Sequence, residues 1–481
     1  MLKSLSHLLF EFSWKLSLSL SLSKVGEMDV ADDGRMRTGT LWTGVAHAFT
    51  ATIGSGILAL PWCVAQLGWI LGLFVLASFA VITFYTATLV SDCYRTPDPV
   101  NGRRNCTYMG AVRALLGPRN VLICGIIQYS NLWGSMIGYT ITTAISMAAL
   151  KRSTCFHEKG QRATCEVPGN LYMLMFGAFE VILSQCPNLE KAAFLSVVAA
   201  ACSLVYSCIA IGLSTAKLIS SNFDFKGSFM VAHQPGMASS TKIFHAFQAF
   251  GNLAFAFNYI TLLLEIQDTL KSPPPENKVM KKVTLCSVGG TALFYIFMAC
   301  TGYGAFGNEV PGNILSGFYN LVWLVDVANL AVIIHLIGAY QVYAQPIFAV
   351  HERWLGSKWP TSFLNRIHTI KFRFITIHFT LGRLLLRSIF VMFTTLVAMI
   401  FPFFTAVLGF IGAISFWPLT VYFPLTMYSV QAKVKRGSST WISFQVLGLV
   451  CLVVTLIATV GSIADILEHR KHAKLFHIDL L

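Results

Sequence analysis

The chain has 481 residues, of which 55% are hydrophobic and only 12% are charged. A soluble domain carries about twice that share of charged residues, so the composition excludes an ordinary soluble protein and indicates a polytopic membrane protein embedded in a lipid bilayer. The formal net charge of +14 is accounted for by membrane topology and contact with anionic lipid, so we expect no nucleic-acid partner.

Apolar windows close to the roughly 20 residues that cross a bilayer recur along most of the chain. The segments that a cytoplasmic N-terminus would place inside hold 25 of the 35 Lys and Arg residues, and cytoplasmic loops are where these residues accumulate. The bias predicts a cytoplasmic N-terminus and an extracellular C-terminus. We place eleven spans at residues 41–62, 69–91, 121–149, 170–187, 192–216, 244–267, 283–306, 322–349, 388–403, 406–429 and 441–463.

Two terminal segments flank the predicted transmembrane domain at 41–466. We expect residues 1–40 to be cytoplasmic, with a disordered extension over 1–27, where Leu and Ser alternate without forming a spanning helix or a signal peptide. A polar lead into the first span begins at Met28, which is therefore a candidate for the functional N-terminus. A short tail at 467–481 completes the chain.

The first span contains the unusual stretch TATIGSGILALPW at Thr50–Trp62. Each glycine of Gly54-Ser55-Gly56 costs about 1 kcal/mol of helix propensity relative to Ala, and Pro61 follows closely. Two interpretations are open. The glycines allow two helices to pack closely, or they mark an unwound stretch whose free backbone N–H groups bind an anion such as a carboxylate.

Among the polar residues of later spans, Asp326 carries the strongest indication of function. It shares a helix face with Asn329, three residues away, and His335 lies further along the same span. A carboxylate inside a membrane is costly, so a proton relay or contact with a substrate amine is its default role. Because no Lys or Arg lies inside any predicted span, we expect Asp326 to lie deep in the bilayer without a cationic partner.

The twelve cysteines show no metal-ligand spacing. Cys155 and Cys165 flank a polar loop on the predicted outer side, where oxidising conditions favour a disulfide between them. The sequon at Asn105 falls in a predicted cytoplasmic loop, so we expect it to be unglycosylated. No nucleophile–base motif, phosphate-binding loop or metal motif is present, and an enzyme is not expected.

Four long blocks carry a family resemblance: GTLWTGVAHAFTATIGSGILALPWCVAQLGW, NLAFAFNYITLLLEIQDTLKSPPPENKVMKK, LVDVANLAVIIHLIGAYQVYAQPIFA and AMIFPFFTAVLGFIGAISFWPLTVYFP. They closely resemble the plant amino acid permeases of the amino acid/auxin permease family, from about Arg35 to about Ile466. The resemblance implies a proton-coupled amino acid symporter of the plasma membrane. The implied fold is an all-α, eleven-helix inverted-repeat bundle of the leucine-transporter type, with the substrate between broken helices 1 and 6.

The resemblance also points to site residues, to which we add the polar Asn131 of the third span. The substrate-binding candidates are Ile53, Gly54, Ser55, Gly56, Ile57, Asn131, Phe255, Phe257, Asn258, Tyr259 and Asn329. The proton-coupling candidates are Asp326, Glu265, His47 and His335. Protons are the expected coupling ion, with no other cofactor and no metal.

This chain departs from its relatives at three acidic positions. Many relatives have Gly-Asp-Ile where it has Gly251-Asn252-Leu253, Asn-Asp after Pro-Phe-Phe where it has Thr405-Ala406, and Glu before Met where it has Thr426-Met427. The loss of these charges argues against cationic substrates and favours neutral amino acids. Two alternatives remain open, namely an auxin-like influx carrier and a receptor or sensor that binds amino acids without transporting them.

Overall fold

The computed structural model describes residues 37–159, 168–185, 189–230, 239–319, 321–372 and 375–472. The predicted extension at 1–27, Met28 and the end of the tail lie outside these residues. The helices are α2 (Leu41–Thr52), α3 (Leu60–Asp92), α4 (Tyr108–Leu116), α5 (Pro118–Lys159), α6 (Gly169–Ser184), α7 (Leu189–Ser220), α8 (Ser239–Ala256), α9 (Ile260–Gln267), α10 (Glu276–Phe306), α11 (Val322–Lys358), α12 (Leu381–Ile400), α13 (Phe404–Ser415), α14 (Phe423–Gln431) and α15 (Ser439–His472).

Shorter helical segments join several of these helices. A 3-10 turn at Ser55–Ala59 lies between α2 and α3, and a π-helical segment at Phe416–Tyr422 joins α13 to α14. Further 3-10 turns lie at Gly307–Glu309, Ile314–Gly317 and Phe363–Asn365. The largest buried cluster lies where these helices meet, and it includes Ile53, Ile57 and Tyr295.

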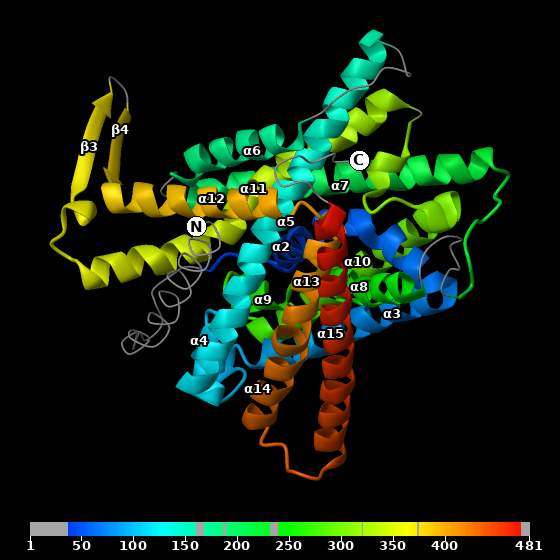
Figure 1. Cartoon of the computed structure of the whole chain (residues 1–481). Coiled ribbons are helices and arrows are strands. Elements are labelled where there is room, and N and C mark those ends of the chain that lie inside the picture. The colour runs from blue at the N-terminus through cyan, green and yellow to red at the C-terminus, as the bar shows by residue number, and fades with distance from the viewer. Residues whose placement is uncertain are drawn as a thin grey trace.

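Nine helices are long and apolar enough to cross a membrane within the part of the chain that the structure describes. The apolar α6 is shorter, and α2 has only 12 residues before regular helix ends. The predicted total of eleven spans therefore stays a prediction. In Figure 1, the axes of α13, α14 and α15 are roughly parallel, with α15 returning antiparallel after the loop that follows α14, whereas α3, α8 and α10 cross them.

The chain is mostly helical, and two loops add short strands that are not among the elements predicted from the sequence. Strands β1 (Arg95–Thr96) and β2 (Arg103–Arg104) form a small antiparallel pair. Strands β3 (Ile367–Phe372) and β4 (Ile375–Thr380) form a longer hairpin that projects from the bundle beside α12 (Figure 1). Their sequences, IHTIKF and ITIHFT, are rich in the β-branched and aromatic residues that favour strands, a local signal that hydropathy windows do not detect.

Helix α3 extends from the end of the first predicted span through the whole of the second, with one kink at Gly68. The φ angle of this residue is +79°, a conformation that glycine adopts without strain. Its neighbour Trp69 donates its backbone N–H to the Ser228 carbonyl oxygen at 3.0 Å. The kink therefore lies in the gap between the first two predicted spans, 41–62 and 69–91.

The backbones of α8 and α13 are in direct contact. A Cβ built on Gly412 of α13 would overlap the carbonyl oxygen of Gly251 on α8. Gly251 therefore lies inside a regular helix as a packing residue. Regular helix continues past Gly251 to Ala256, and the interruption follows there.

Charged side chains join the loops at the predicted inner end of the bundle. The Arg37 Nη2 donates to Asp268 Oδ1 at 2.9 Å, and the Tyr94 hydroxyl donates to the same oxygen at 2.7 Å. Burial and this hydrogen bond raise the pKa of Tyr94, so the phenol stays protonated as a donor. The Gly39 N–H donates to the Thr269 carbonyl oxygen at 2.9 Å, so the start of α2 is fastened to the end of α9.

Helix α12 extends beyond the predicted span of 388–403 and includes Arg383 and Arg387. This helix begins at Leu381, seven residues before the predicted span, with the Thr380 side chain accepting from the Arg383 N–H. Arg387 is only 2% exposed, and its Nε donates to Glu352 Oε1 at 2.6 Å. The ion pair and the cap make the earlier helix start favourable despite the charges.

Candidate functional site

The first interruption lies between Thr52 and Leu60. Gly54 is extended, with φ −117° and ψ −161°, and a 3-10 turn begins at Ser55. The Gly54 N–H donates to the Thr52 carbonyl oxygen at 3.0 Å, whereas the N–H groups of Ser55 and Gly56 have no backbone acceptor among the described residues. Two adjacent amide donors are therefore left free, as at the start of any helix.

The second interruption separates α8 from α9 at Phe257, Asn258 and Tyr259. The Tyr295 hydroxyl of α10 joins both interruptions, because it donates to the Thr52 carbonyl oxygen at 2.7 Å and lies 3.2 Å from the carbonyl oxygen at the end of α8. Both α2 and α8 end with carbonyl groups that have lost their helical partners. One phenol thus holds the two helix ends together.

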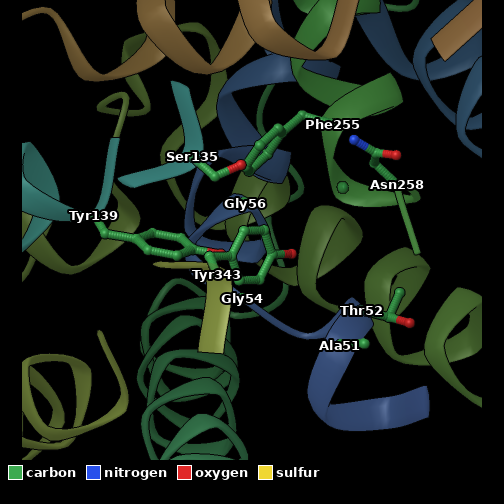
Figure 2. Close-up of a pocket in the computed structure, with 10 residues that line it drawn as sticks. Ala51, Thr52, Gly54, Gly56, Ser135, Tyr139, Phe255, Asn258 and Tyr343 are labelled. Atoms are coloured by element: carbon green, nitrogen blue, oxygen red, sulfur yellow. The ribbon is translucent and has the colours of Figure 1, made fainter. Parts of the chain in front are cut away.

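A pocket lies between these two interruptions, with about 320 Å³ of empty space counting its opening. Its lining consists of Ala51, Thr52, Gly54, Gly56, Ser135, Tyr139, Phe255, Ala256, Asn258 and Tyr343. In Figure 2, the rings of Tyr139 and Tyr343 lie across from Thr52 and Asn258. None of these lining residues carries a formal charge.

Asn258 is held in place by a hydrogen bond to the Ser415 hydroxyl on α13. Its Nδ2 donates to Ser415 Oγ at 3.3 Å, and the Asn131 Nδ2 of α5 donates to the same oxygen at 2.9 Å. Ser415 in turn donates to the Ile411 carbonyl oxygen at 2.7 Å. This donor pattern leaves the Asn258 Oδ1 without a partner among the described residues.

Unsatisfied polar atoms of both kinds lie at or beside the residues that line the pocket. The Asn258 Oδ1 is a buried acceptor, and the hydroxyl of Ser55, which is 1% exposed, also lacks a partner in the described part of the chain. The free N–H groups of Ser55 and Gly56 are donors. Buried polar groups are normally paired, so such atoms beside a cavity are suited to a polar ligand.

Aromatic side chains form the wall opposite the interruptions. The rings of Tyr139 and Tyr343 pack edge to face, with centroids 5.4 Å apart. Ser135 and Tyr139 of α5 are absent from the predicted site. Their spacing of four residues, which also separates Asn131 from Ser135, places all three on one helix face and is the signal that could have identified them.

The predicted substrate residues separate into two groups. Gly54, Gly56, Phe255 and Asn258 line the pocket, and Ser55 lies between the two glycines. Asn131 reaches the pocket through Ser415, as described above.

The remaining candidates lie elsewhere. Ile53, Ile57 and Phe257 are buried in the core. Tyr259 is hydrogen-bonded to Thr284, with their hydroxyl oxygens 3.0 Å apart. Asn329 donates to the Val325 carbonyl oxygen of its own helix at 3.0 Å.

None of the four predicted proton-coupling residues lines the pocket. Asp326 is partly exposed in the second turn of α11 and accepts from Ser153 Oγ at 2.6 Å, so the expectation of a position deep in its span is wrong. His47 is exposed on α2, and Glu265 is partly buried on α9 with its Oε2 unpartnered among the described residues. His335 is buried, with Nδ1 2.8 Å from the Ala199 carbonyl oxygen.

The sequence predicts a disulfide in the loop after α5, which it places on the outer side. Cys155 is disulfide-bonded. Its predicted partner, Cys165, lies outside the described residues, so the pairing stays a prediction.

Comparison with known proteins identifies the family. Residues 37–468 match the model of the family described as "Transmembrane amino acid transporter protein". The chain is 50% identical to amino acid permease 8 of Arabidopsis thaliana over 452 residues, covering 93% of this chain and 95% of the relative. It is 48% identical to amino acid permease 1 of the same plant, covering 93% of each chain. The chain belongs to the transmembrane amino acid transporter family.

The fold of this family member is also found in a solved structure. The crystal structure of MhsT in complex with L-phenylalanine matches with a TM-score of 0.55 and 11% sequence identity, covering 89% of this chain and 100% of that one. At this identity the likeness shows the fold alone. It establishes the helical bundle of the leucine-transporter type as the architecture around the pocket.

Proposed function

We propose that this transporter is a proton-coupled symporter that imports neutral amino acids across the plasma membrane, with its N-terminus in the cytoplasm and its C-terminus outside. The pocket between the two helix interruptions carries the proposal. Free amide donors lie on one of its sides, and a buried amide acceptor lies on another. These are the partners that the carboxylate and the ammonium group of an amino acid require.

The carboxylate binds at the N–H groups of Ser55 and Gly56. Backbone N–H groups at the start of a helical segment attract an anion through their hydrogens and their aligned dipoles. The ammonium group donates to the Asn258 Oδ1, which points away from the Ser415 bond. The two groups of the substrate thus satisfy atoms that are unpaired without it.

The side chain of the substrate packs against Phe255, Tyr139 and Tyr343. Because the lining contains no charged side chain, a charged substrate side chain would be buried without a partner, at a cost of several kcal/mol. Asn252 supports the same conclusion. It replaces an acidic residue of many relatives and is itself only 2% exposed.

The proposed architecture has eleven membrane helices in an inverted repeat. The broken first helix consists of α2, the turn at Ser55–Ala59 and the start of α3, and the broken sixth consists of α8 and α9. The ends and the pocket of these segments support this assignment. The π-helical segment then belongs to the tenth helix, which runs from α13 to α14.

Protons are the proposed coupling ion, and Asp326 remains one candidate for binding them. Substitution of Asp326 by Asn preserves the hydrogen bond from Ser153 but removes the titrating carboxyl. We expect Asp326→Asn to lose accumulation driven by a pH gradient, with any residual uptake independent of external pH. A normally expressed variant with unchanged pH dependence would exclude Asp326 and direct attention to Glu265, His47 and His335.

The deciding experiment is uptake of labelled neutral amino acids into vesicles that contain the purified protein, with and without an inwardly directed proton gradient. Accumulation above the external concentration, present only with the gradient, is the expected result. Saturable binding without accumulation would instead indicate a receptor or sensor. Accumulation of an auxin in preference to amino acids would indicate an auxin carrier.

A further inference from the structure

Glu180 is the one charged residue in the sequence of α6, and its side chain is fully buried. The Gln341 Nε2 of α11 donates to Glu180 Oε2 at 2.5 Å and to Ser184 Oγ at 3.1 Å. The Glu180 Oε1 has no hydrogen-bond partner among the described residues. The carboxyl group is therefore only half satisfied, whether or not it carries a proton. Such a group inside a membrane is costly and calls for a functional explanation.

The charged groups around Glu180 come from the helices that pack on α6, namely α5, α11 and α12. Charged residues of α5 lie only near its two ends. From Tyr340 to Arg353 of α11 and along α12, the titratable and charged residues are Tyr340, Tyr343, His351, Glu352, Arg353, Arg383 and Arg387. Tyr340 is occupied by Thr394, with their hydroxyl oxygens 2.7 Å apart.

Arg387 of α12 contacts α6 at a point one helical turn after Glu180. Its Nη1 donates to the Ser184 carbonyl oxygen, and Ser184 follows Glu180 by four residues. Its Nε donates to Glu352 Oε1 at 2.6 Å. The Glu352 side chain is 29% exposed, at the predicted inner end of the bundle. The Arg387–Glu352 ion pair therefore extends from the buried region near Glu180 toward the solution.

We propose that Glu180 is a proton-binding residue of the transport cycle that releases its proton toward the predicted inner side, an inference that rests on the proposed proton-coupled function. With its proton bound, Glu180 is neutral and the bond from Gln341 stabilises it. On release, the carboxyl O–H bond breaks and the proton passes to water beside Glu352, with no other bond or redox change. The remaining carboxylate then requires a counter-charge, which Arg387 supplies by turning from Glu352 toward Glu180.

The link to substrate binding runs through α11. Gln341, the donor to Glu180, precedes Tyr343 of the pocket wall by two residues on this helix. A small rotation or shift of α11 as the pocket closes on a substrate therefore changes the hydrogen bond from Gln341 to the Glu180 carboxyl group. Substrate binding and proton affinity are coupled in this way because both depend on the position of the same rigid helix.

The test uses Glu180→Gln in vesicles, since glutamine keeps the size of the side chain and accepts from Gln341 but cannot exchange a proton at neutral pH. We expect gradient-driven accumulation to fall by about tenfold or more, while exchange of labelled for unlabelled amino acid at equal pH stays within about twofold of the wild type. Glu180→Asp is expected to restore part of the gradient response. Glu309→Gln, at an exposed position in the 3-10 turn that follows α10, is the matched control.

Two results would overturn the inference. The first is that Glu180→Gln accumulates substrate with the gradient as well as the wild type does. The second is that a normally inserted Glu180→Gln protein loses exchange and accumulation equally, which would indicate a structural role. Failure of the wild type itself to respond to the gradient would instead overturn proton coupling. That failure is visible before any variant is made, so the two proposals fail separately.

Discussion

Two glycine regions of this transporter look alike in sequence and act in opposite ways. A Cβ built on Gly54, at the first interruption, would meet no atom within 4 Å, whereas a Cβ on Gly412 would overlap the backbone of Gly251. Both glycines lie in apolar membrane segments. The first leaves open space beside the pocket, and the second closes the space between α8 and α13. A glycine in a membrane helix is therefore informative only together with what faces it.

The two regions meet at Phe255. Its Cδ1 lies 3.3 Å from the position of a Cβ on Gly56, and its backbone nitrogen lies 2.6 Å from that of a Cβ on Gly412. The tight contact of α8 with α13 thus sets the position of one wall of the pocket. Substitutions that affect one region and spare the other test this division of roles.

The largest effect is expected at the helix contact. Gly412→Leu places a side chain into the backbone of α8, where neither helix can yield, at a cost above about 4 kcal/mol. We expect almost no monodisperse protein in size-exclusion chromatography. Gly212→Leu on α7, where a Cβ meets no atom within 4 Å, is the control and should be recovered normally. Normal recovery of Gly412→Leu would contradict the tight contact.

A large effect on transport alone is expected at the interruption. Leucine tolerates the extended backbone of Gly54, and its side chain enters the open space beside the pocket. We expect Gly54→Leu to reach the membrane in normal amounts and to lose substrate uptake by about tenfold or more, because the ligand space is filled. Gly54→Ala should have an intermediate effect. If both variants transport normally, the pocket is not the substrate site.

A moderate loss of stability is expected where α10 joins the two interruptions. Tyr295→Phe removes the hydroxyl that bonds the Thr52 carbonyl oxygen and leaves a buried acceptor less well satisfied, at a cost of about 1–3 kcal/mol. The melting temperature in detergent should fall and uptake should decrease. Tyr319→Phe changes an exposed phenol and should alter neither value. An unchanged melting temperature for Tyr295→Phe would show that the hydroxyl does not join the helix ends.

The smallest effect is expected at the inner end. Asp268→Asn keeps an acceptor for Tyr94 but removes the charge that pairs with Arg37, at a cost of about 1 kcal/mol. Amides at the start of α2 should exchange their hydrogens faster, while those of α8 beside Gly251 should not. Hydrogen exchange is measured by mass spectrometry in the wild type and the variant. If the substitution changes the exchange rate equally at α2 and α8, the ion pair does not fasten α2.

Much of the bundle could be predicted from the sequence, because membrane spans follow from local hydropathy and the loops from the distribution of Lys and Arg. The interruption near Gly54 was open to two interpretations, and the family resemblance pointed to Asn258 and Phe255. The sequence could not locate the end of α8 at Ala256. Gly251 lowers the local helix propensity, whereas packing of Gly251 against α13 stabilises the helix there. That packing energy depends on a partner some 160 residues away in the chain.

The sequence by itself determined the membrane class and the approximate positions of the apolar spans, since both depend on neighbours along the chain. Only the tertiary structure decided which polar atoms remain unpaired. Asn131 and Asn258 meet on Ser415, and Tyr343 faces Tyr139, through contacts between helices far apart in sequence. The same holds for Glu180 and Arg387, whose burial and partners depend on three packed helices. Hydropathy records how apolar a segment is, but the desolvation and pairing of a charge depend on the atoms packed around it.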